Sequence, residues 1–486
     1  MSRKICFVAS EITPLAKTGG LADVAGALGC YLHTQGHDVR LFMPYYSTID
    51  LRGQVPTAMA DVQQVVVQLG SQQMAFSLYE TTLPGSAVPV YLVDCPQLYA
   101  RESLYTTAVD EHLRFFLFQI AVLESCQRLR FRPDIMHCND WHTGLLPLLL
   151  RTRYAWDALF ARTRTLLTIH NIGYQGVFPA DTATELGLDT TPGLLDEGEL
   201  SRGNVNWLRQ GLLLADAVST VSPTYAQEIC TPQGGYGLDD TLRARARPAI
   251  GILNGVDYDD WNPEVDKLLS QHYSADRLDG KRKLKTELQE RFGLGREGSV
   301  PLAGIVSRLT VQKGFDLLFD TLPAILDTRP MQVAVLGTGE PRYVSFFAEL
   351  TRQYPGRVAF HTGYHEELAH LIEAGSDMFI MPSLYEPCGL NQMYSLKYGT
   401  VPIVRRTGGL ADSVQMWDPQ SSQGTGIVFN DFDAPAMRWA LGTALDLYAD
   451  RDAWSRIMRN GMSQDFSWKT QGREYERLYE QLIEKG

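Results

Sequence analysis

The chain has 486 residues and a formal net charge of −12, from 44 lysines and arginines against 56 aspartates and glutamates. A chain of this length is too long for one ordinary hydrophobic core, so we expect two domains of roughly 200–250 residues each. The acidic balance argues against a nucleic-acid partner or an anionic membrane, because both require a basic surface, and any anionic substrate would have to be met by a few placed lysines and arginines.

The first half alternates short apolar runs with helical periodicity, which is typical of α/β proteins with a parallel sheet. Residues 5–9 form the first predicted strand. They are too few for the apolar core of a signal peptide. Residues 22–35 follow as a helix, with Gly36 as its C-terminal stop. The later predicted elements are strands at residues 39–43, 88–93, 135–138, 165–169 and 217–221, and a helix at residues 112–129.

The alternation breaks at residues 250–257 and restarts at residues 302–306. Between them, the lysine-rich residues 281–292 predict an exposed helix. The chain therefore divides into two α/β halves near residue 254. The later predicted strands are residues 302–306, 333–336, 358–360, 378–381 and 402–404.

The cysteines and the apolar runs indicate where the protein works. Seven cysteines are scattered without a C-x-x-C pair, which favours a reducing cytoplasm over a disulfide framework or a zinc site. No run of about 18 apolar residues occurs, so no membrane span is expected.

Loops at the carboxyl ends of parallel strands are where ligands bind, and the first such loop holds Lys17, Gly19 and Gly20 directly before a helix. Paired glycines let the backbone approach a ligand, and the helix N-terminus favours an anion. The alternative is a surface turn with a solvated lysine, and the loop alone does not decide between them.

Two further strand ends in the first half carry His137, Asp140, His142 and His170. A lone histidine at a strand end is usually structural, but this grouping favours a ligand site modestly. The spacings match no metal-binding pattern, so no metal is expected.

In the second half, Arg308 ends a predicted strand and Lys313 opens the following helix, which suits a diphosphate clamp as well as it suits a solvated loop. Glu386 lies at another strand end. A carboxylate disfavours an adjacent diphosphate, so Glu386 is better placed to accept hydrogen bonds from sugar hydroxyls. A glycine-rich strand end follows at residues 407–409.

Two motifs are set aside. Residues 337–342 begin like a dinucleotide-binding fingerprint but have Arg342 where the third glycine belongs. Three D-x-D triplets, at residues 257–259, 431–433 and 450–452, are interpreted as turn residues.

Ten segments, in collinear order across nearly the whole chain, resemble the bacterial glycogen synthases and plant starch synthases. They are residues 9–11, 17–23, 140–142, 168–171, 254–257, 261–263, 307–309, 312–316, 386–390 and 406–412.

The resemblance implies the GT-B fold, an α/β architecture of two Rossmann-like domains that face a deep inter-domain cleft. Residues 1–250 would form the acceptor-side domain and residues 251–463 the nucleotide-sugar-binding domain, while residues 464–486 would hold a helix that packs back on the first domain. The family transfers glucose from ADP-glucose to the non-reducing end of an α-1,4-glucan such as glycogen, with retention at the anomeric carbon and without a metal or other cofactor.

The resemblance also implies roles for individual residues. Arg308 and Lys313 would neutralise the leaving diphosphate, Glu386 would hold the glucose, and His170 and Asp140 would contact its hydroxyls or the reacting face. Tyr99 lies in a loop that resembles the acceptor side of the family. The remaining residues expected to bind the nucleotide sugar are Lys17, Gly19, Gly20, Asn254, Cys388, Gly389, Leu390, Thr407 and Gly408.

Alternatives remain open at this stage. One is another retaining GT-B transferase that uses UDP-glucose or a small acceptor, and another is a non-catalytic glucan-binding protein. The sequence predicts neither the oligomeric state nor the preference between ADP-glucose and UDP-glucose.

Overall fold

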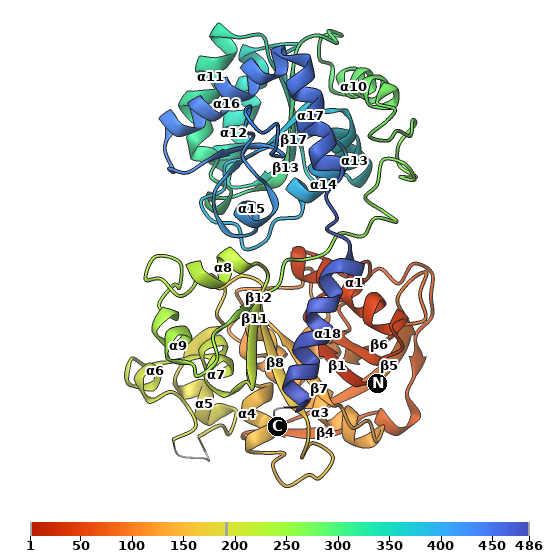
Figure 1. Ribbon diagram of the computed structural model, residues 1–486. Coiled ribbons are helices and arrows are strands. Elements are labelled where there is room, and N and C mark those ends of the chain that lie inside the picture. Colours follow the sequence, from red (N-terminus) through yellow and green to blue (C-terminus); the bar gives the residue numbers. More distant parts are fainter. Residues whose placement is uncertain (1, 190–192, 485–486) are drawn as a thin grey trace. The chain divides into compact units, whose positions relative to one another are not determined.

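The computed structural model describes residues 2–189 and 193–484, and the chain divides into two compact units. The first comprises Met1–Val221, Ala226–Gly255 and Trp468–Gly486, and the second comprises Ser222–Tyr225 and Val256–Ser467. Each unit has its own central sheet (Figure 1). The chain thus leaves the first unit after Gly255 and returns to it at Trp468.

The sheet of the first unit has the strand order β12-β11-β8-β7-β1-β2-β6-β5-β3, and β4 also pairs with β5. The strands from β12 to β6 are mutually parallel, and β5 runs antiparallel to its neighbours. The strands are β1 (Lys4–Val8), β2 (Asp38–Pro44), β3 (Thr57–Ala58), β4 (Val65–Leu69), β5 (Gln72–Thr82), β6 (Pro89–Asp94), β7 (Ile135–Asn139), β8 (Arg164–Ile169), β11 (Ala217–Thr220) and β12 (Ile250–Gly251), with β9 (Val177–Pro179) and β10 (Asn204–Asn206) as a separate pair.

Helix α1 (Gly20–Thr34) shows how the apolar pattern builds this unit. Leu21, Ala25, Leu28 and Leu32, spaced by three or four residues, are all buried on one face. Gly36 adopts a φ of 85°, the left-handed conformation that ends many helices. The other helices of the unit are η1 (Ala60–Val62), α2 (Pro96–Tyr99), α3 (Glu111–Arg128), η2 (Trp141–Thr143), α4 (Leu146–Arg151), α5 (Asp181–Glu185), α6 (Glu197–Ser201), α7 (Trp207–Leu214) and α9 (Asp239–Ala244), and α8 (Pro223–Glu228) has residues in both units.

The last helix, α18 (Trp468–Glu484), packs beside α1 in the first unit (Figure 1). A Cβ on Gly472 would lie 2.3 Å from the ring of Tyr31, so the two helices approach closely at that point. Tyr31 donates a hydrogen bond of 2.7 Å to Glu476. Lys485, the predicted end of this helix, lies outside the described residues.

The second unit contains a six-stranded, fully parallel sheet in the order β15-β14-β13-β16-β17-β18. In Figure 1, α11, α12 and α16 lie on one side of strands β13 and β17, and α13 and α14 lie on the other. The strands are β13 (Leu302–Leu309), β14 (Gln332–Gly339), β15 (Val358–Thr362), β16 (Met378–Met381), β17 (Val401–Arg405) and β18 (Ile427–Phe429). The helices are α10 (Asp279–Phe292), η3 (Val311–Lys313), η4 (Phe315–Leu317), α11 (Leu318–Thr328), α12 (Pro341–Gln353), α13 (Glu366–Gly375), α14 (Asn391–Lys397), α15 (Gly408–Ser413), α16 (Ala434–Ala449) and α17 (Arg451–Met462).

Residues 281–292 form a helix, as predicted. The prediction that this helix is exposed is wrong for two of its lysines. Lys281 and Lys285 are buried, and their ammonium groups find partners inside the unit. Lys281 donates to Thr400 at 2.6 Å, and Lys285 donates to Asp377 at 2.6 Å. Long lysine stems suit such buried positions when the charged head is satisfied.

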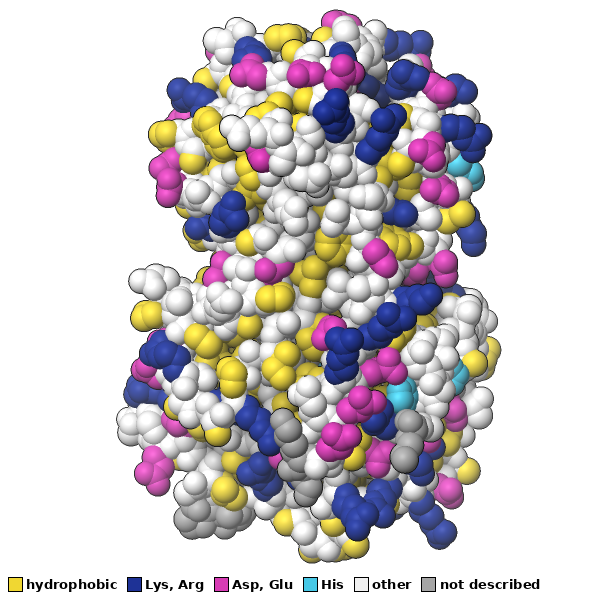
Figure 2. Space-filling view, viewed as in Figure 1, with side chains coloured by type: hydrophobic (Ala, Val, Ile, Leu, Met, Phe, Trp, Pro, Cys, Tyr) yellow, Lys and Arg dark blue, Asp and Glu magenta, His cyan; other side chains and the backbone are white. Residues whose placement is uncertain are grey.

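The surface and the helices bear on two classes of partner that the sequence argued against, nucleic acids and membranes. Figure 2 shows acidic and basic side chains interspersed on the face that it draws, without a continuous basic surface. Within residues 2–189 and 193–484, no helix has the length and apolar character needed to cross a membrane.

Candidate active site

The first cluster lies at the carboxyl edge of the sheet in the first unit. Strands β1, β7 and β8 are parallel neighbours, so the residues that follow them meet at one edge. The carboxylate of Asp140, after β7, accepts a 2.7 Å hydrogen bond from the backbone N–H of His170, after β8. The structure therefore brings together the two residues that the sequence predicted as neighbours.

Asp140 is buried in a strained backbone conformation. Its φ is 55°, which non-glycine residues rarely adopt. Burial raises the pKa of its carboxyl to about 7, although the hydrogen bonds from the backbone of His170 and Asn171 lower it in part. A carboxyl with this pKa can accept or release a proton near neutral pH.

His170 is held as a neutral imidazole. Burial lowers its pKa to about 3. Its Nε2 lies 2.8 Å from Oδ1 of Asn139, whose amide nitrogen donates to the carbonyl of Val8, so His170 is the donor in that contact. The assignment leaves Nδ1 as an acceptor, which is the role needed to receive a sugar hydroxyl.

The other two histidines have structural surroundings. His137 lies inside β7, fully buried, between the hydroxyls of Tyr479 and Thr168 at 2.8 and 2.7 Å. His142 stacks on Trp141 with a ring separation of 4.0 Å. Burial lowers the pKa of both imidazoles well below the usual range.

The loop that begins α1 is organised by Glu11, a residue that the sequence reasoning did not select. Its buried carboxylate accepts hydrogen bonds from the backbone and hydroxyl of Thr18 at 2.5 and 2.8 Å. Burial raises the pKa of Glu11 to about 7. Lys17 is partly exposed and donates to Asp23 at 2.7 Å, so its charge is shared within the loop.

Gly19 caps α1 in an extended conformation, and Gly20 is its first residue. A Cβ on Gly20 would meet no atom within 4 Å. Packing inside the protein therefore does not require glycine at position 20, and the space beside it is open to a ligand.

Two predicted residues of the first unit are buried. Asn254 is 3% exposed, and its Oδ1 has no hydrogen-bond partner among the described residues. Tyr99 is fully buried, and its hydroxyl donates to the carbonyl of Arg114 at 2.9 Å. The side chain of Tyr99 therefore cannot touch a glucan directly, and the place of its segment on the acceptor side stays a prediction.

The second cluster lies at the carboxyl edge of the sheet in the second unit and centres on an ion pair. The ammonium of Lys313 donates to Oε2 of Glu386 at 2.7 Å, and the hydroxyl of Ser383 donates to the same oxygen at 3.0 Å. Glu386 is 4% exposed. Gly314 makes the approach possible, because its φ is 71° and a Cβ there would lie 2.0 Å from the carbonyl of Pro382.

A cavity of about 160 Å³ adjoins this ion pair. Arg308, Lys313, Ser383, Gly389 and Leu390 are among the residues that line it. Arg308 is exposed, and no ion pair or side-chain hydrogen bond within the described part of the chain engages its guanidinium. The cavity thus combines one available cation with a second cation that is already bound to a carboxylate.

The glycines after β17 pack against the backbone of this cluster. A Cβ on Gly408 would lie 1.9 Å from the carbonyl of Glu386, and one on Gly409 would lie 2.1 Å from that of Cys388. Thr407 and Cys388 are both buried. The structure therefore places Thr407 and Gly408 against the backbone of the Glu386 loop, where they position that loop.

The motifs that were set aside form turns and helix caps. Asp433 and Asp450 cap α16 and α17, and Asp257 accepts from the backbone of Asp259, so their interpretation as turn residues is confirmed. One group of described residues has the spacing of metal ligands, namely Asp260, Glu366 and His370.

Glu11 and Ser383 are the functional candidates that sequence reasoning missed. Glu11 follows the first strand directly, so its place at a strand end was available as a signal. Ser383 precedes Glu386 by three residues, but nothing in that spacing indicates that its hydroxyl turns toward the carboxylate.

The chain has the two-domain α/β fold of the GT-B glycosyltransferases, with a polar cluster at the carboxyl edge of each sheet. Residues 4–244 match the starch synthase catalytic domain family, and residues 287–461 match the glycosyl transferases group 1 family. The chain is 43% identical over 486 residues to a glycogen synthase of Geotalea daltonii, covering 99% of each chain. The chain belongs to the glycogen and starch synthase family.

Two solved structures resemble this fold. The catalytic domain of starch synthase IV from Arabidopsis thaliana, bound to ADP and acarbose, has a TM-score of 0.91 and 34% identity, with 100% of each chain covered. A sucrose-phosphate synthase from Thermosynechococcus elongatus has a TM-score of 0.63 and 18% identity over 100% of each chain, which shows a shared fold alone.

Proposed function

We propose that this chain is a retaining glucosyltransferase that moves glucose from ADP-glucose to the non-reducing end of an α-1,4-glucan. The observation that carries the proposal is the cavity where the exposed Arg308 lies beside the Lys313–Glu386 pair. Membership of the family and the ADP-bound starch synthase with the same fold support ADP-glucose as the donor.

In this proposal the second unit, which includes most of residues 251–463, holds the donor. Cleavage of the bond between glucose and phosphate increases the negative charge on the leaving diphosphate. Arg308 and Lys313 stabilise that charge, and the N–H groups of Gly389 and Leu390 contribute beside them. Glu386 accepts hydrogen bonds from the glucose hydroxyls, and its bonds to Lys313 and Ser383 fix its orientation.

The first unit, which includes most of residues 1–250 and the last helix, serves the acceptor and the reacting face of the sugar. The free Nδ1 of His170 accepts a glucose hydroxyl, and Asp140 orients the loop that carries this histidine through its bond to the backbone of His170. Asn254 supports the sugar site indirectly, because its unpartnered Oδ1 has no exposed surface. Lys17, Gly19 and Gly20 approach the phosphates, which is supported by the open space beside Gly20.

The same polar groups suit any nucleoside diphosphate glucose, so UDP-glucose is the alternative donor. The groups described here recognise the sugar and the phosphates, and none of them distinguishes adenine from uracil. The cysteine pattern supports a cytoplasmic site of action, because none of the seven cysteines forms a disulfide, including Cys6 and Cys126 with sulfurs 4.0 Å apart.

The direct test supplies ADP-glucose with glycogen and follows ADP release, with UDP-glucose and small sugars as parallel donors and acceptors. We expect release that depends on glycogen and is faster with ADP-glucose. Release that requires a small acceptor would favour another transferase of this fold. Glycogen binding without release would indicate a non-catalytic glucan-binding protein.

A further inference from the structure

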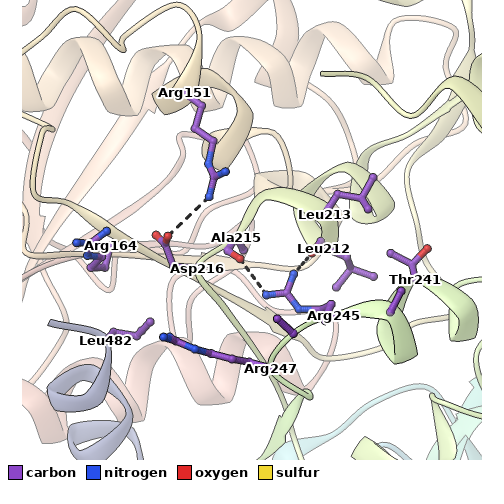
Figure 3. Close-up of a pocket in the computed structure, with 12 residues that line it drawn as sticks. Arg151, Arg164, Leu212, Leu213, Ala215, Asp216, Thr241, Arg245, Arg247 and Leu482 are labelled. Atoms are coloured by element: carbon purple, nitrogen blue, oxygen red, sulfur yellow. Dashed lines mark hydrogen bonds and ion pairs between the residues drawn. The ribbon is translucent and has the colours of Figure 1, made fainter. Parts of the chain in front are cut away.

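A second cavity, of about 450 Å³, lies in the first unit and is lined by an unusual concentration of arginines (Figure 3). Its volume is in the range of small-molecule sites. Asp216 is the only acidic residue among the described residues that line it. The arginines are Arg151, Arg164, Arg245 and Arg247.

The cavity is separate from the candidate active site within the same unit. Arg164 begins β8, whereas His170 directly follows its last residue. Asp216 precedes β11, the parallel neighbour of β8. The cavity therefore lies at the amino edge of the sheet, roughly 20 Å along the strand from the carboxyl edge.

The arginines are held close enough to repel one another. Arg245 is fixed by donating to the carbonyls of Leu212 and Ala215, the latter at 2.9 Å. Desolvation lowers the pKa of its guanidinium, Asp216 opposes that effect, and Arg151 and Arg247 lower the pKa further. Arg151 lies 3.7 Å from Asp216, and half of its side chain is exposed. The Asp216 carboxylate therefore interacts with both Arg151 and Arg245.

Two residues of the lining carry buried polar atoms without a partner. The Nε–H of Arg245 and the hydroxyl of Thr241 have no hydrogen-bond partner among the described residues and no exposed surface, so they do not face the cavity themselves. The groups that a ligand can reach are the exposed parts of the arginines. The excess of positive charge favours an acceptor that is an anion.

The lining also indicates which anion fits. It contains no aromatic side chain, so it lacks the stacking surface on which sugar rings and bases usually rest. Several arginines around one volume match the oxygens of a phosphate group, because guanidinium groups bind phosphate through paired N–H donors. Figure 3 shows Arg151 directed toward Asp216 and Arg247 extended toward Leu482.

We propose that this cavity binds a small phosphorylated molecule through Arg151, Arg164 and Arg247, with Arg245 as its fixed wall. The site is independent of the proposed glucosyl transfer and would exist even if the chain had another activity.

The test measures the binding of inorganic pyrophosphate by titration calorimetry at about 0.1 M salt, where exposed charges farther apart than about 10 Å are largely screened. The full chain carrying Arg308→Ala and Lys313→Ala is used, so that the two cations proposed to stabilise the leaving diphosphate do not contribute. We expect saturable binding to this variant. Adding Arg247→Glu should weaken it by roughly tenfold or more, because a charge-assisted bond is replaced by repulsion.

Arg162→Glu is the matched control. Arg162 is exposed, lies two residues from Arg164 and does not line the cavity, so the same change of charge there should leave binding within about twofold. If Arg247→Glu impairs folding, Arg247→Gln is measured in its place, and it should also weaken binding. The proposal is overturned if the Arg308→Ala, Lys313→Ala chain does not bind pyrophosphate, or if Arg162→Glu weakens binding as much as Arg247→Glu does.

Discussion

At the scale of single residues, two cations beside the same cavity differ in what they stabilise. Lys313 is bonded to a carboxylate that is almost completely buried, whereas Arg308 is exposed and has no ion pair within the described chain. Removing one partner of a buried pair leaves an uncompensated charge and is strongly destabilising. Substituting each of the two residues therefore distinguishes an effect on stability from an effect on catalysis.

Arg308→Ala should lower kcat by roughly 10²–10³-fold, because a cation at the leaving group is lost, and should change the free energy of unfolding by less than about 0.5 kcal/mol. Lys313→Ala should lower kcat similarly and also cost roughly 3 kcal/mol of stability. Steady-state kinetics and urea unfolding measure both effects. Equal stability losses in the two variants would contradict this distinction.

Asp140 gives the fold a specific pH dependence. The folded protein keeps a proton on Asp140 up to about pH 7, whereas the unfolded chain releases it near the ordinary value for aspartate, 3.8. This group therefore contributes stability at low pH that is lost as the pH rises toward 7. Relative to the unmodified protein, Asp140→Asn should gain roughly 2 kcal/mol between pH 5 and pH 8.

Urea unfolding at both pH values measures this gain. Asp418→Asn is the control, because hydrogen bonds from Ser421 lower the pKa of the exposed Asp418 carboxyl, so its effect on stability should be the same at pH 5 and pH 8. A stability difference between Asp140→Asn and the unmodified protein that does not change with pH would contradict the protonated state of Asp140.

At the scale of elements, most strands and helices follow from the apolar pattern, because a sheet covered on both faces demands continuous apolar runs. The pattern also places Asp140 and His170 at neighbouring strand ends. It does not reveal burial that depends on distant contacts. The hydroxyl of Tyr99 is satisfied by the carbonyl of Arg114, fifteen residues away, and Lys281 is buried through Thr400.

The N-terminus of α1 can be tested as an element. Gly20→Ala introduces a methyl group that meets no protein atom, at a residue whose φ is not positive, so stability should be unchanged or rise by about 0.5 kcal/mol. The methyl group occupies space proposed for the phosphates. The value of kcat/KM for ADP-glucose should therefore fall by roughly tenfold.

Gly442→Ala in α16 is the matched control, because its Cβ also meets nothing within 4 Å. It should be stabilising and leave kcat/KM unchanged. Unaltered kinetics in Gly20→Ala would remove the α1 N-terminus from the donor site.

At the scale of the whole molecule, the two units repeat one principle: a parallel sheet presents its polar groups at the carboxyl edge. The first unit supplies a neutral histidine and carboxyls with raised pKa values, and the second supplies cations and a glutamate paired with one of them. Collinear motifs in both halves allowed the fold to be predicted from sequence. The roles within each cluster needed coordinates, because hydrogen bonds such as those from Ser383 to Glu386 and from Thr18 to Glu11 depend on how loops turn.

The most direct measurement of the central claim is nuclear magnetic resonance of the product formed from ADP-[¹³C]glucose and a short α-1,4-glucan. The account predicts one labelled residue at the non-reducing end, joined by an α-1,4 bond, with the anomeric configuration of the donor retained. A β-linked product, labelled free glucose alone, or no transfer by the folded protein would contradict it.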